Sequence, residues 1–237
     1  MYRRSLFAAG LAVGTIWALA GAAAMAETVA IIGTGNVGAA LGQRFAAVGH
    51  EVVYGSREPD RSDVRQLVEA SGPSASAATP GVAAEGADFI VLAVPWEVVE
   101  QVTRGLGDLS GRIVVDPTNP RVVADDGLRD YAFDGSNAER IQAAAPRARV
   151  VKAFSTLGAG TMLDPSIAGG PVSVPIAGDD PSAREAVAGL VAAIGLHPVD
   201  VGPLRYAHVI EGLHYLRNNA GQVGDSRLNF YFPPDPH

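Results

Sequence analysis

Residues 28–38 read TVAIIGTGNVG, an apolar run followed directly by a complete G-x-G-x-x-G turn. The run predicts a buried strand, and the apolar spacing after the turn predicts a helix. In such a unit Gly33 permits the tight turn, Gly35 lets the backbone approach a pyrophosphate, and Gly38 lets the helix pack on the strand. The free N–H groups at the start of the helix favour phosphate. This stretch therefore predicts dinucleotide binding rather than a purely structural turn.

The rest of the chain repeats the alternation of short apolar runs and amphipathic segments that is typical of β-α-β units. The predicted strands are residues 28–32, 50–54, 89–94, 112–115, 149–153, 172–177 and 197–201. The predicted helices are residues 37–48, 59–71, 96–103, 138–145, 181–194 and 203–218. Residues 124–137 are predicted as a loop, and the tail from Gly221 as irregular.

This order predicts a Rossmann-type, doubly wound α/β fold with a mostly parallel sheet. Residues 27–155 are predicted to form the dinucleotide-binding domain. Residues 156–237 lack a linker and are predicted to form a C-terminal α/β extension packed on the same body.

The composition limits the classes of function. The 237 residues carry a formal net charge of −7 without a cluster of Lys or Arg, which argues against nucleic acid as a partner. Cysteine is absent, so disulfides and thiolate metal sites are excluded. With 48% hydrophobic residues, the chain can bury one sizeable core.

The first 26 residues differ from the rest. A pair of arginines precedes an uncharged stretch at residues 6–24, and residues 24–26 have the small-x-small pattern that signal peptidase reads. The arginine pair resembles a twin-arginine signal, so we expect residues 1–26 to be a cleavable signal peptide and the protein to be exported to the periplasm. Two alternatives stay open: an uncleaved membrane anchor, and translation from Met25 that leaves the protein in the cytoplasm.

The end of the second predicted strand indicates which dinucleotide is bound. NAD-binding versions of the fold carry an acid there to bind the ribose 2′-hydroxyl. This chain has Gly55-Ser56-Arg57 instead, and a hydroxyl with a guanidinium suits a 2′-phosphate. NADP(H) is therefore the predicted cofactor, with an ordinary surface arginine as the alternative interpretation of Arg57.

Two further strand ends carry candidate ligand contacts, at residues 93–96 (AVPW) and 116–120 (DPTNP). Ligands of open α/β sheets lie over the carboxyl ends of strands, and Asn119 has the groups to hold a carboxamide or a ribose. Proline and asparagine are also common where strands stop, so both interpretations stay open.

Three polar residues, His208, Glu211 and His214, share one face of the last predicted helix. A metal or acceptor site is one interpretation, but the spacing is not that of the zinc peptidase motif. We favour a polar helix face and predict no metal site. For three aromatic residues both cofactor contact and packing stay open: Trp96, Tyr206 and Tyr215.

The ordered series of motifs resembles the coenzyme F420-dependent NADP oxidoreductases and is similar to the reductase domain of the STEAP metalloreductases. The series comprises residues 32–38, Gly55-Ser56-Arg57, Ala93-Val94-Pro95, residues 116–120 and residues 151–159. Residues 177–180 and 200–204 are similar too, so the resemblance runs from residue 28 to about 216.

The resemblance implies where NADP(H) is held. Thr34, Asn36 and Val37 would line the pyrophosphate, and Ser56 and Arg57 would hold the 2′-phosphate. Val94 and Pro95 would flank the ribose, Asn119 would lie near the nicotinamide, and the loop around Leu157 and Ala159 would meet the carboxamide. The full predicted set is Gly33, Thr34, Gly35, Asn36, Val37, Gly38, Ser56, Arg57, Ala93, Val94, Pro95, Asn119, Leu157 and Ala159.

The resemblance also implies the reaction, a hydride transfer between NADPH and a flavin or deazaflavin as second substrate. That step depends on positioning, so we predict no catalytic acid or base. Ser155 stands where relatives often carry Asn, and the chain end lacks a longer Gly-rich segment associated with the deazaflavin site. Two alternatives therefore stay open: a nucleotide-binding module without chemistry, and a reductase of a small imine or carbonyl. A homodimer, and a membrane contact through an uncleaved N-terminal segment, are also left open.

Overall fold

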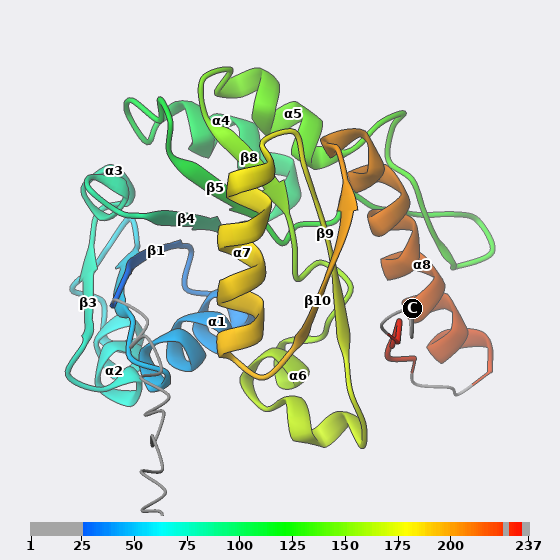
Figure 1. The fold of residues 1–237 in the computed structure, drawn as a ribbon, viewed down its shortest axis with the longest axis horizontal. Coiled ribbons are helices and arrows are strands. Elements are labelled where there is room, and N and C mark those ends of the chain that lie inside the picture. Colours follow the sequence, from blue (N-terminus) through cyan, green and yellow to red (C-terminus); the bar gives the residue numbers. More distant parts are fainter. Residues whose placement is uncertain (1–25, 225–227, 234–237) are drawn as a thin grey trace, which may run out of the picture.

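The computed structural model describes residues 26–224 and 228–233. Its main sheet has eight strands in the order β10-β9-β8-β5-β4-β1-β2-β3 (Figure 1). The strands are β1 Thr28–Ile32, β2 Glu51–Gly55, β3 Ala75–Ala78, β4 Phe89–Leu92, β5 Ile113–Asp116, β8 Arg149–Lys152, β9 Ser173–Gly178 and β10 His197–Gly202. A small hairpin pairs β6 Val122–Val123 with β7 Arg129–Asp130.

The α-helices are α1 Asn36–Ala47, α2 Ser62–Ser71, α3 Pro80–Ala84, α4 Val99–Arg104, α5 Asn137–Ala144, α6 Ala159–Leu163, α7 Pro181–Ala193 and α8 Ala207–Val223. Short 3₁₀ turns occupy Trp96–Val98, Pro165–Ala168 and Leu204–Tyr206. Neighbouring strands of the main sheet are parallel, except for the antiparallel pair β8 and β9. The prediction of a Rossmann-type, mostly parallel α/β fold is confirmed.

The sheet is covered by helices on both faces, and β1 shows why its sequence is apolar throughout. Val29 and Ile31 face a core built with α1, α6 and α7, whereas Ala30 and Ile32 face a core built with α3, α4 and α5. Because successive side chains of a strand point to opposite faces, a strand covered on both sides cannot alternate with polar residues. Figure 1 shows α1 below strands β4 and β5, on one face of the sheet, and α4 and α5 above them, on the other face.

Several predicted boundaries differ from the structure. The sequence prediction omitted β3 and α3, because their residues are mostly Ala, Ser and Gly and carry no apolar run. The predicted loop 124–137 includes the β7 strand, and the segment predicted to be irregular from Gly221 remains helical to Val223. The last helix begins at Ala207 rather than at residue 203, because Leu204–Tyr206 forms a 3₁₀ turn first.

The C-terminal segment continues the sheet through β9 and β10. The tail then returns to β9, where the Ser173 N–H donates to the Phe230 carbonyl (2.7 Å) and the Phe232 N–H donates to Ser173 Oγ (2.9 Å). Among the described helices, none is long and apolar enough to cross a membrane. The predicted signal peptide lies outside the described residues, apart from Ala26.

Candidate active site

The glycine turn joins β1 to α1 as the motif predicts. Gly33 has φ of 109°, and its N–H donates to the Gly55 carbonyl of β2 (3.0 Å). A Cβ at Gly33 would lie closer than 3.0 Å to the Ala93 carbonyl oxygen, and one at Gly38 would be equally close to the Gly33 oxygen. By contrast, a Cβ at Gly35 would meet nothing within 4 Å. The open space at Gly35 is the cradle that a pyrophosphate needs at the start of α1.

A cavity of about 550 Å³ opens over the carboxyl ends of β1, β2 and β4. Of the predicted set, the residues that line it are Gly33, Thr34, Gly35, Ser56, Arg57, Ala93, Val94 and Pro95. The predicted residues outside this lining are Asn36, Val37, Gly38, Asn119, Leu157 and Ala159. The sequence prediction missed several lining residues, among them Arg61, Pro80, Val98, Gln101 and Val102.

The positive charge of the cavity lies at the end of β2. Arg57 is exposed, and no carboxylate lies within 4.0 Å of its guanidinium in the described part of the chain. Ser56 is buried, and its Oγ accepts the Glu58 N–H (3.2 Å), which leaves the hydroxyl proton free to be donated. Arg61 adds a second guanidinium, paired with Asp63 at 2.5 Å. This lining fits a 2′-phosphate, although the exposed Glu58 carboxylate also borders it.

Asn119 connects the end of β5 to the loop that follows β8. Its Nδ2 donates to the Ser155 carbonyl (2.9 Å), while its Oδ1 is buried without a partner in the described residues. Ser155 Oγ and Thr156 Oγ1 are buried and unpartnered in the same way. Buried polar atoms of folded proteins are normally satisfied, so this cluster fits the amide and hydroxyl groups of a nicotinamide riboside.

The loop after β8 starts with a strained residue. Phe154 is the one non-glycine residue with positive φ, 64°, among the described residues, and its ring packs edge-on against Phe45 at 6.1 Å. This conformation costs about 1–2 kcal/mol for an L-residue, and such strain concentrates at functional sites. Leu157, three residues on, is buried in the core, and Ala159 begins α6. The predicted carboxamide loop is therefore held by core packing.

Beneath this loop lies a buried ionic cluster that the sequence prediction missed. Lys152 and Asp116 are register partners on the adjacent strands β8 and β5, and Lys152 Nζ donates to Asp116 Oδ2 (2.9 Å). The same ammonium donates to Glu211 Oε1 on α8 (2.6 Å) and to the Thr118 carbonyl. All three charged side chains are 0% exposed. The only signal in the sequence was Lys152, which directly follows the apolar pair Val150-Val151 in β8.

The cluster places two carboxylates around one ammonium. Burial lowers the pKa of Lys152, but Asp116 and Glu211 outweigh it and raise that pKa above its usual range. For Glu211, burial raises the pKa to about 7, against the lowering effect of Lys152, and Asp116 raises it further. The pKa values of Lys152 and Glu211 are therefore both raised. As a result, the lysine remains charged, and Glu211 holds a proton more readily than an exposed glutamate does.

The other polar residues of α8 are held by local contacts. His208 Nδ1 lies 2.7 Å from the Gly135 carbonyl, and its ring stacks on Tyr131 at 4.3 Å. His214 is partly buried, and desolvation, together with three nearby arginines, lowers its pKa to about 4. Of the predicted polar helix face, Glu211 is fully buried, whereas His208 and His214 are partly exposed. No group of three or more His, Asp or Glu side chains could hold a metal ion in the described part of the chain.

Trp96, Tyr206 and Tyr215, for which cofactor contact and packing were both considered, lie in different surroundings. Trp96 begins a 3₁₀ turn, lies outside the cavity lining and contacts the Phe133 ring at 6.1 Å. Tyr215 is buried and donates its hydroxyl to the Pro120 carbonyl. Tyr206 is exposed beneath the Arg205 guanidinium.

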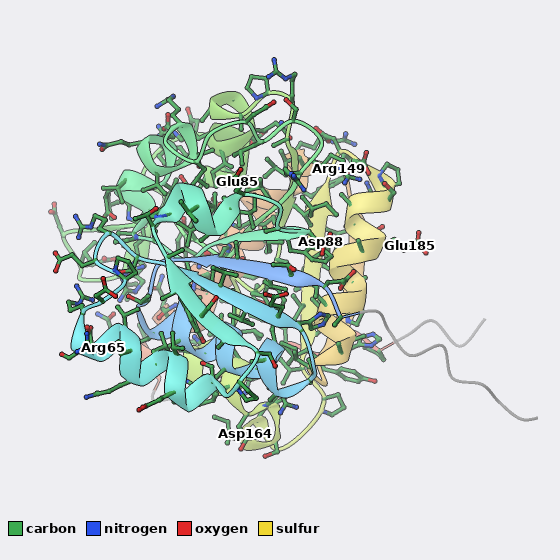
Figure 2. All side chains as sticks on the ribbon, turned by 90° about the vertical axis from the view of Figure 1, so that its left-hand side faces the viewer. Arg65, Glu85, Asp88, Arg149, Asp164 and Glu185 are labelled. Atoms are coloured by element: carbon green, nitrogen blue, oxygen red, sulfur yellow. The ribbon has the colours of Figure 1, made fainter. Side chains whose placement is uncertain are left out.

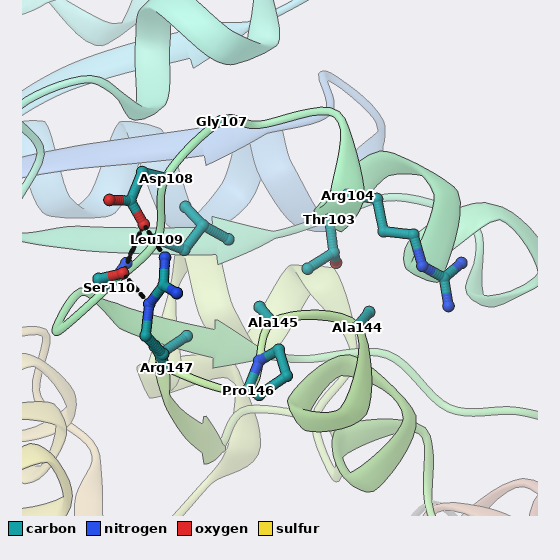
Figure 3. Close-up of a pocket in the computed structure, with 11 residues that line it drawn as sticks. Thr103, Arg104, Gly107, Asp108, Leu109, Ser110, Ala144, Ala145, Pro146 and Arg147 are labelled. Atoms are coloured by element: carbon teal, nitrogen blue, oxygen red, sulfur yellow. Dashed lines mark hydrogen bonds and ion pairs between the residues drawn. The ribbon is translucent and has the colours of Figure 1, made fainter.

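A smaller hollow of about 260 Å³ lies at the opposite end of the sheet, before β5 and β8 (Figure 3). There the Arg147 guanidinium is bound to Ser110 Oγ (2.6 Å) and Asp108 (3.3 Å). Ligands of this fold class lie over the carboxyl ends of strands, so this hollow at their amino ends is not a candidate cofactor site.

Comparison with known proteins places the chain in a family. Residues 28–120 match the family model described as NADP oxidoreductase, coenzyme F420-dependent. The chain is also 31% identical over 196 residues to the F420-dependent NADP reductase of Methanothermobacter marburgensis, a match covering 76% of this chain and 85% of that protein. The chain belongs to the coenzyme F420-dependent NADP oxidoreductase family. The resemblance seen in the sequence is thereby confirmed.

Two further similarities show how much of the chain, and how much of each relative, the resemblance covers. A solved structure of a candidate F420-dependent NADP reductase from Arthrobacter sp. FB24 is 30% identical, with a TM-score of 0.78, over 88% of this chain and all of that one. Metalloreductase STEAP3 of Rattus norvegicus is 30% identical over 190 residues, covering 79% of this chain. The chain spans only 36% of the length of STEAP3. The expectation of an NADP-dependent oxidoreductase is confirmed at the level of the family.

Proposed function

We propose that this protein transfers hydride between NADPH and a flavin-type or deazaflavin acceptor. The observation that carries the proposal is the cavity over β1, β2 and β4, which combines the glycine cradle with the guanidinium of Arg57. NADPH, when bound, supplies the hydride. The names of the relatives, F420-dependent NADP reductases, support a deazaflavin ring as acceptor.

The chain's own residues have the task of binding and orienting. Gly35 leaves room for the pyrophosphate, and Ser56 and Arg57 bind the 2′-phosphate. The Asn119–Ser155 hydrogen bond fixes the loop that would face the nicotinamide. Holding two rings in reacting geometry supplies the catalysis, because the hydride passes directly between carbon or nitrogen atoms of the rings. The proton that accompanies ring reduction is supplied by water.

Single-turnover mixing of the full chain with NADPH and a panel of acceptors tests the proposal, with loss of NADPH absorbance as the signal. The panel contains riboflavin, flavin mononucleotide and a 5-deazaflavin. We expect oxidation of NADPH with at least one of them and much slower oxidation of NADH. Tight NADPH binding without oxidation by any acceptor would contradict hydride transfer and support a nucleotide-binding module without chemistry.

A further inference from the structure

Lys152 is the only lysine in the chain, since the other 17 of its 18 positively charged side chains are arginine. It is completely buried, and the two other buried Asp, Glu, Lys or Arg side chains of the described residues, Asp116 and Glu211, both bind it. A buried ion pair is a poor way to stabilise a fold, because apolar residues of similar volume often do as well or better. Stability alone therefore does not explain why a charged cluster lies here.

The contacts of the cluster converge on Thr118, the residue before Asn119. The Thr118 carbonyl accepts from Lys152 Nζ, and the Thr118 N–H donates to Asp116 Oδ1 (2.8 Å). The Thr118 hydroxyl donates to the same carboxylate oxygen (2.6 Å). All three polar groups of Thr118 are thus bound by the cluster, so the backbone that leads into Asn119 is fixed.

Lys152 is itself held in one place. An ammonium has three N–H groups, and Lys152 directs them to Asp116 Oδ2 (2.9 Å), Glu211 Oε1 (2.6 Å) and the Thr118 carbonyl. Asn137 adds two contacts, since its N–H donates to Glu211 Oε1 (3.0 Å) and its side-chain amide donates to the Thr118 hydroxyl. A buried ammonium whose donors are all used has one favourable position, and Thr118 is held with it.

Asn119 has little freedom on its other side as well. Pro120 follows it, and proline restricts the backbone of the residue before it. Asn119 Nδ2 donates to the Ser155 carbonyl (2.9 Å), and Oδ1 is left buried without a partner in the described residues. An amide oxygen accepts N–H groups, and the carboxamide of nicotinamide has two of them. The free oxygen is thus held rigidly where the nicotinamide is proposed to lie.

We propose that Lys152 is a positioning residue for hydride transfer: through Thr118 it fixes the Asn119 amide, which turns one face of the nicotinamide toward the acceptor. The inference rests on the proposed function, because it assigns the group that orients the ring from which the hydride leaves. In the transfer the C4–H bond of the nicotinamide breaks, and the hydrogen passes with both electrons to the acceptor ring. Affinity comes from the phosphate contacts at the glycine turn and Arg57, so displacing Asn119 should change the transfer more than the binding.

Thr118→Val tests this link without removing a buried charge. It loses the hydroxyl that binds Asp116, whereas Thr118→Ser retains it. NADPH deuterated at C4 on one face or the other is mixed with flavin mononucleotide, riboflavin or a 5-deazaflavin, and single turnovers give the rate and the face of transfer. We expect Thr118→Val to transfer about threefold more slowly or worse and from both faces, at nearly unchanged NADPH affinity. Thr118→Ser should transfer from one face at the unaltered rate.

Lys152→Met should have a larger effect of the same kind, about tenfold or more on the rate, because the Thr118 carbonyl loses its donor. Gln142→Ala is the matched control for lost stability. The Gln142 side chain donates to the Ala148 carbonyl (3.0 Å) and accepts the Val150 N–H (3.4 Å) at the start of β8, whereas Lys152 ends that strand. Gln142→Ala should lower the urea midpoint and leave the rate and face of transfer unchanged. If Lys152→Met does not fold, the two Thr118 variants decide the test.

The single lysine also gives a signal that does not depend on turnover. In protein labelled with ¹⁵N at lysine Nζ, Lys152 supplies the only lysine ammonium resonance in the nuclear magnetic resonance spectrum. NADP⁺ should shift this resonance, and Asn119→Ala should remove most of the shift. Adenosine 2′,5′-bisphosphate carries the 2′-phosphate without a nicotinamide, so it should bind and leave the resonance in place.

Three results would overturn the inference: a Thr118→Val protein that keeps the unaltered rate and face, equal effects of Thr118→Val and Gln142→Ala on transfer, or equal shifts with NADP⁺ and the bisphosphate. These results are separable from the proposed function. A lysine resonance that responds to NADP⁺ through Asn119, in a protein that no acceptor oxidises, retains the positioning contact and loses hydride transfer. Normal transfer with an unresponsive lysine and an unaffected Thr118→Val retains hydride transfer and rejects the positioning role.

Discussion

The ammonium of Lys152 donates to the carboxylate of Glu211 across 2.6 Å, with both side chains completely withdrawn from solvent. This contact ties α8 to the end of β8, and Asp116 extends it to β5. Glu211 Oε1 also accepts the N–H of Asn137 at the start of α5 (3.0 Å). One ionic cluster thus joins two strand ends and two helices directly beneath the loops proposed to hold the nicotinamide.

Lys152→Met should destabilise the fold strongly. It leaves two buried carboxylates without their cation, and breaking a buried ion pair from one side costs roughly 3–5 kcal/mol. Glu211→Gln retains hydrogen-bonding groups at the position and should cost clearly less. Urea unfolding followed by circular dichroism measures both, with Glu185→Gln on the surface of α7 as control (Figure 2 labels Glu185). Equal, small effects of Lys152→Met and Glu185→Gln would contradict the role of the cluster.

The same glutamate should give a pH dependence of stability. Its pKa in the folded protein is about 7, above the 4.5 of an unperturbed glutamate, so its contribution is fully present below pH 4.5. The contribution is lost as the pH rises toward and through 7. Relative to Glu211→Gln, which cannot ionise, the unaltered protein should therefore lose free energy of unfolding between about pH 4.5 and 7. A difference that stays constant across this window would contradict the raised pKa.

Substitutions at the three glycines of the turn should distinguish an effect on protein stability from an effect on NADPH affinity. Gly33→Ala and Gly38→Ala each place a Cβ against a backbone carbonyl and should destabilise the protein severely. Gly35→Ala meets open space, so the fold should persist. Its Cβ occupies the room left for the pyrophosphate, so we expect about a tenfold or greater loss of NADPH affinity by isothermal titration calorimetry. Unchanged affinity in Gly35→Ala would argue against phosphate binding at this turn.

Arg57→Gln should reduce the discrimination between NADPH and NADH. The guanidinium has no carboxylate partner in the described residues and borders the cavity, so its loss should weaken NADPH binding by about 10- to 100-fold. NADH binding should change little, because NADH lacks the 2′-phosphate. Arg65→Gln is the matched control, since Arg65 is exposed on α2 outside the cavity lining (Figure 2). Parallel losses for both cofactors in Arg57→Gln would contradict 2′-phosphate recognition.

The N-terminal segment predicts a mature protein that starts at Glu27. Intact-mass spectrometry of the protein purified from its native host should give a chain without residues 1–26. A mass that retains the segment would indicate an anchor, and a mass starting at Met25 would indicate translation from that residue. The same spectrum under native conditions should show NADP(H) bound, because export by a twin-arginine route would carry the folded protein with its cofactor.

Sequence patterns were sufficient where the structural requirement is local. The strand–turn–helix unit at residues 28–47 requires a strand that is apolar on both faces and glycines at a fixed spacing. Both features can be recognised in the sequence. β3 was missed because ASAA pairs with β2 through its backbone and gives no apolar signal. Arg61 and Pro80 line the cavity but were not predicted to do so, because their position depends on how α2 and α3 pack against the sheet.

The chain order of glycines and apolar runs was enough to predict the Rossmann framework, and the Ser56-Arg57 pair predicted NADP(H) as the cofactor. Those features act through backbone geometry and short-range contacts, which neighbouring residues set. The Lys152–Glu211 contact and the exposure of Arg217 to a cavity came only from folding. The Lys152–Glu211 contact joins residues that are 59 positions apart in the sequence. The position of Arg217 depends on the packing of α8 against the loop after β8. Whether a charge is neutralised or left to bind a ligand depends on which elements pack around it, and no local pattern contains that information.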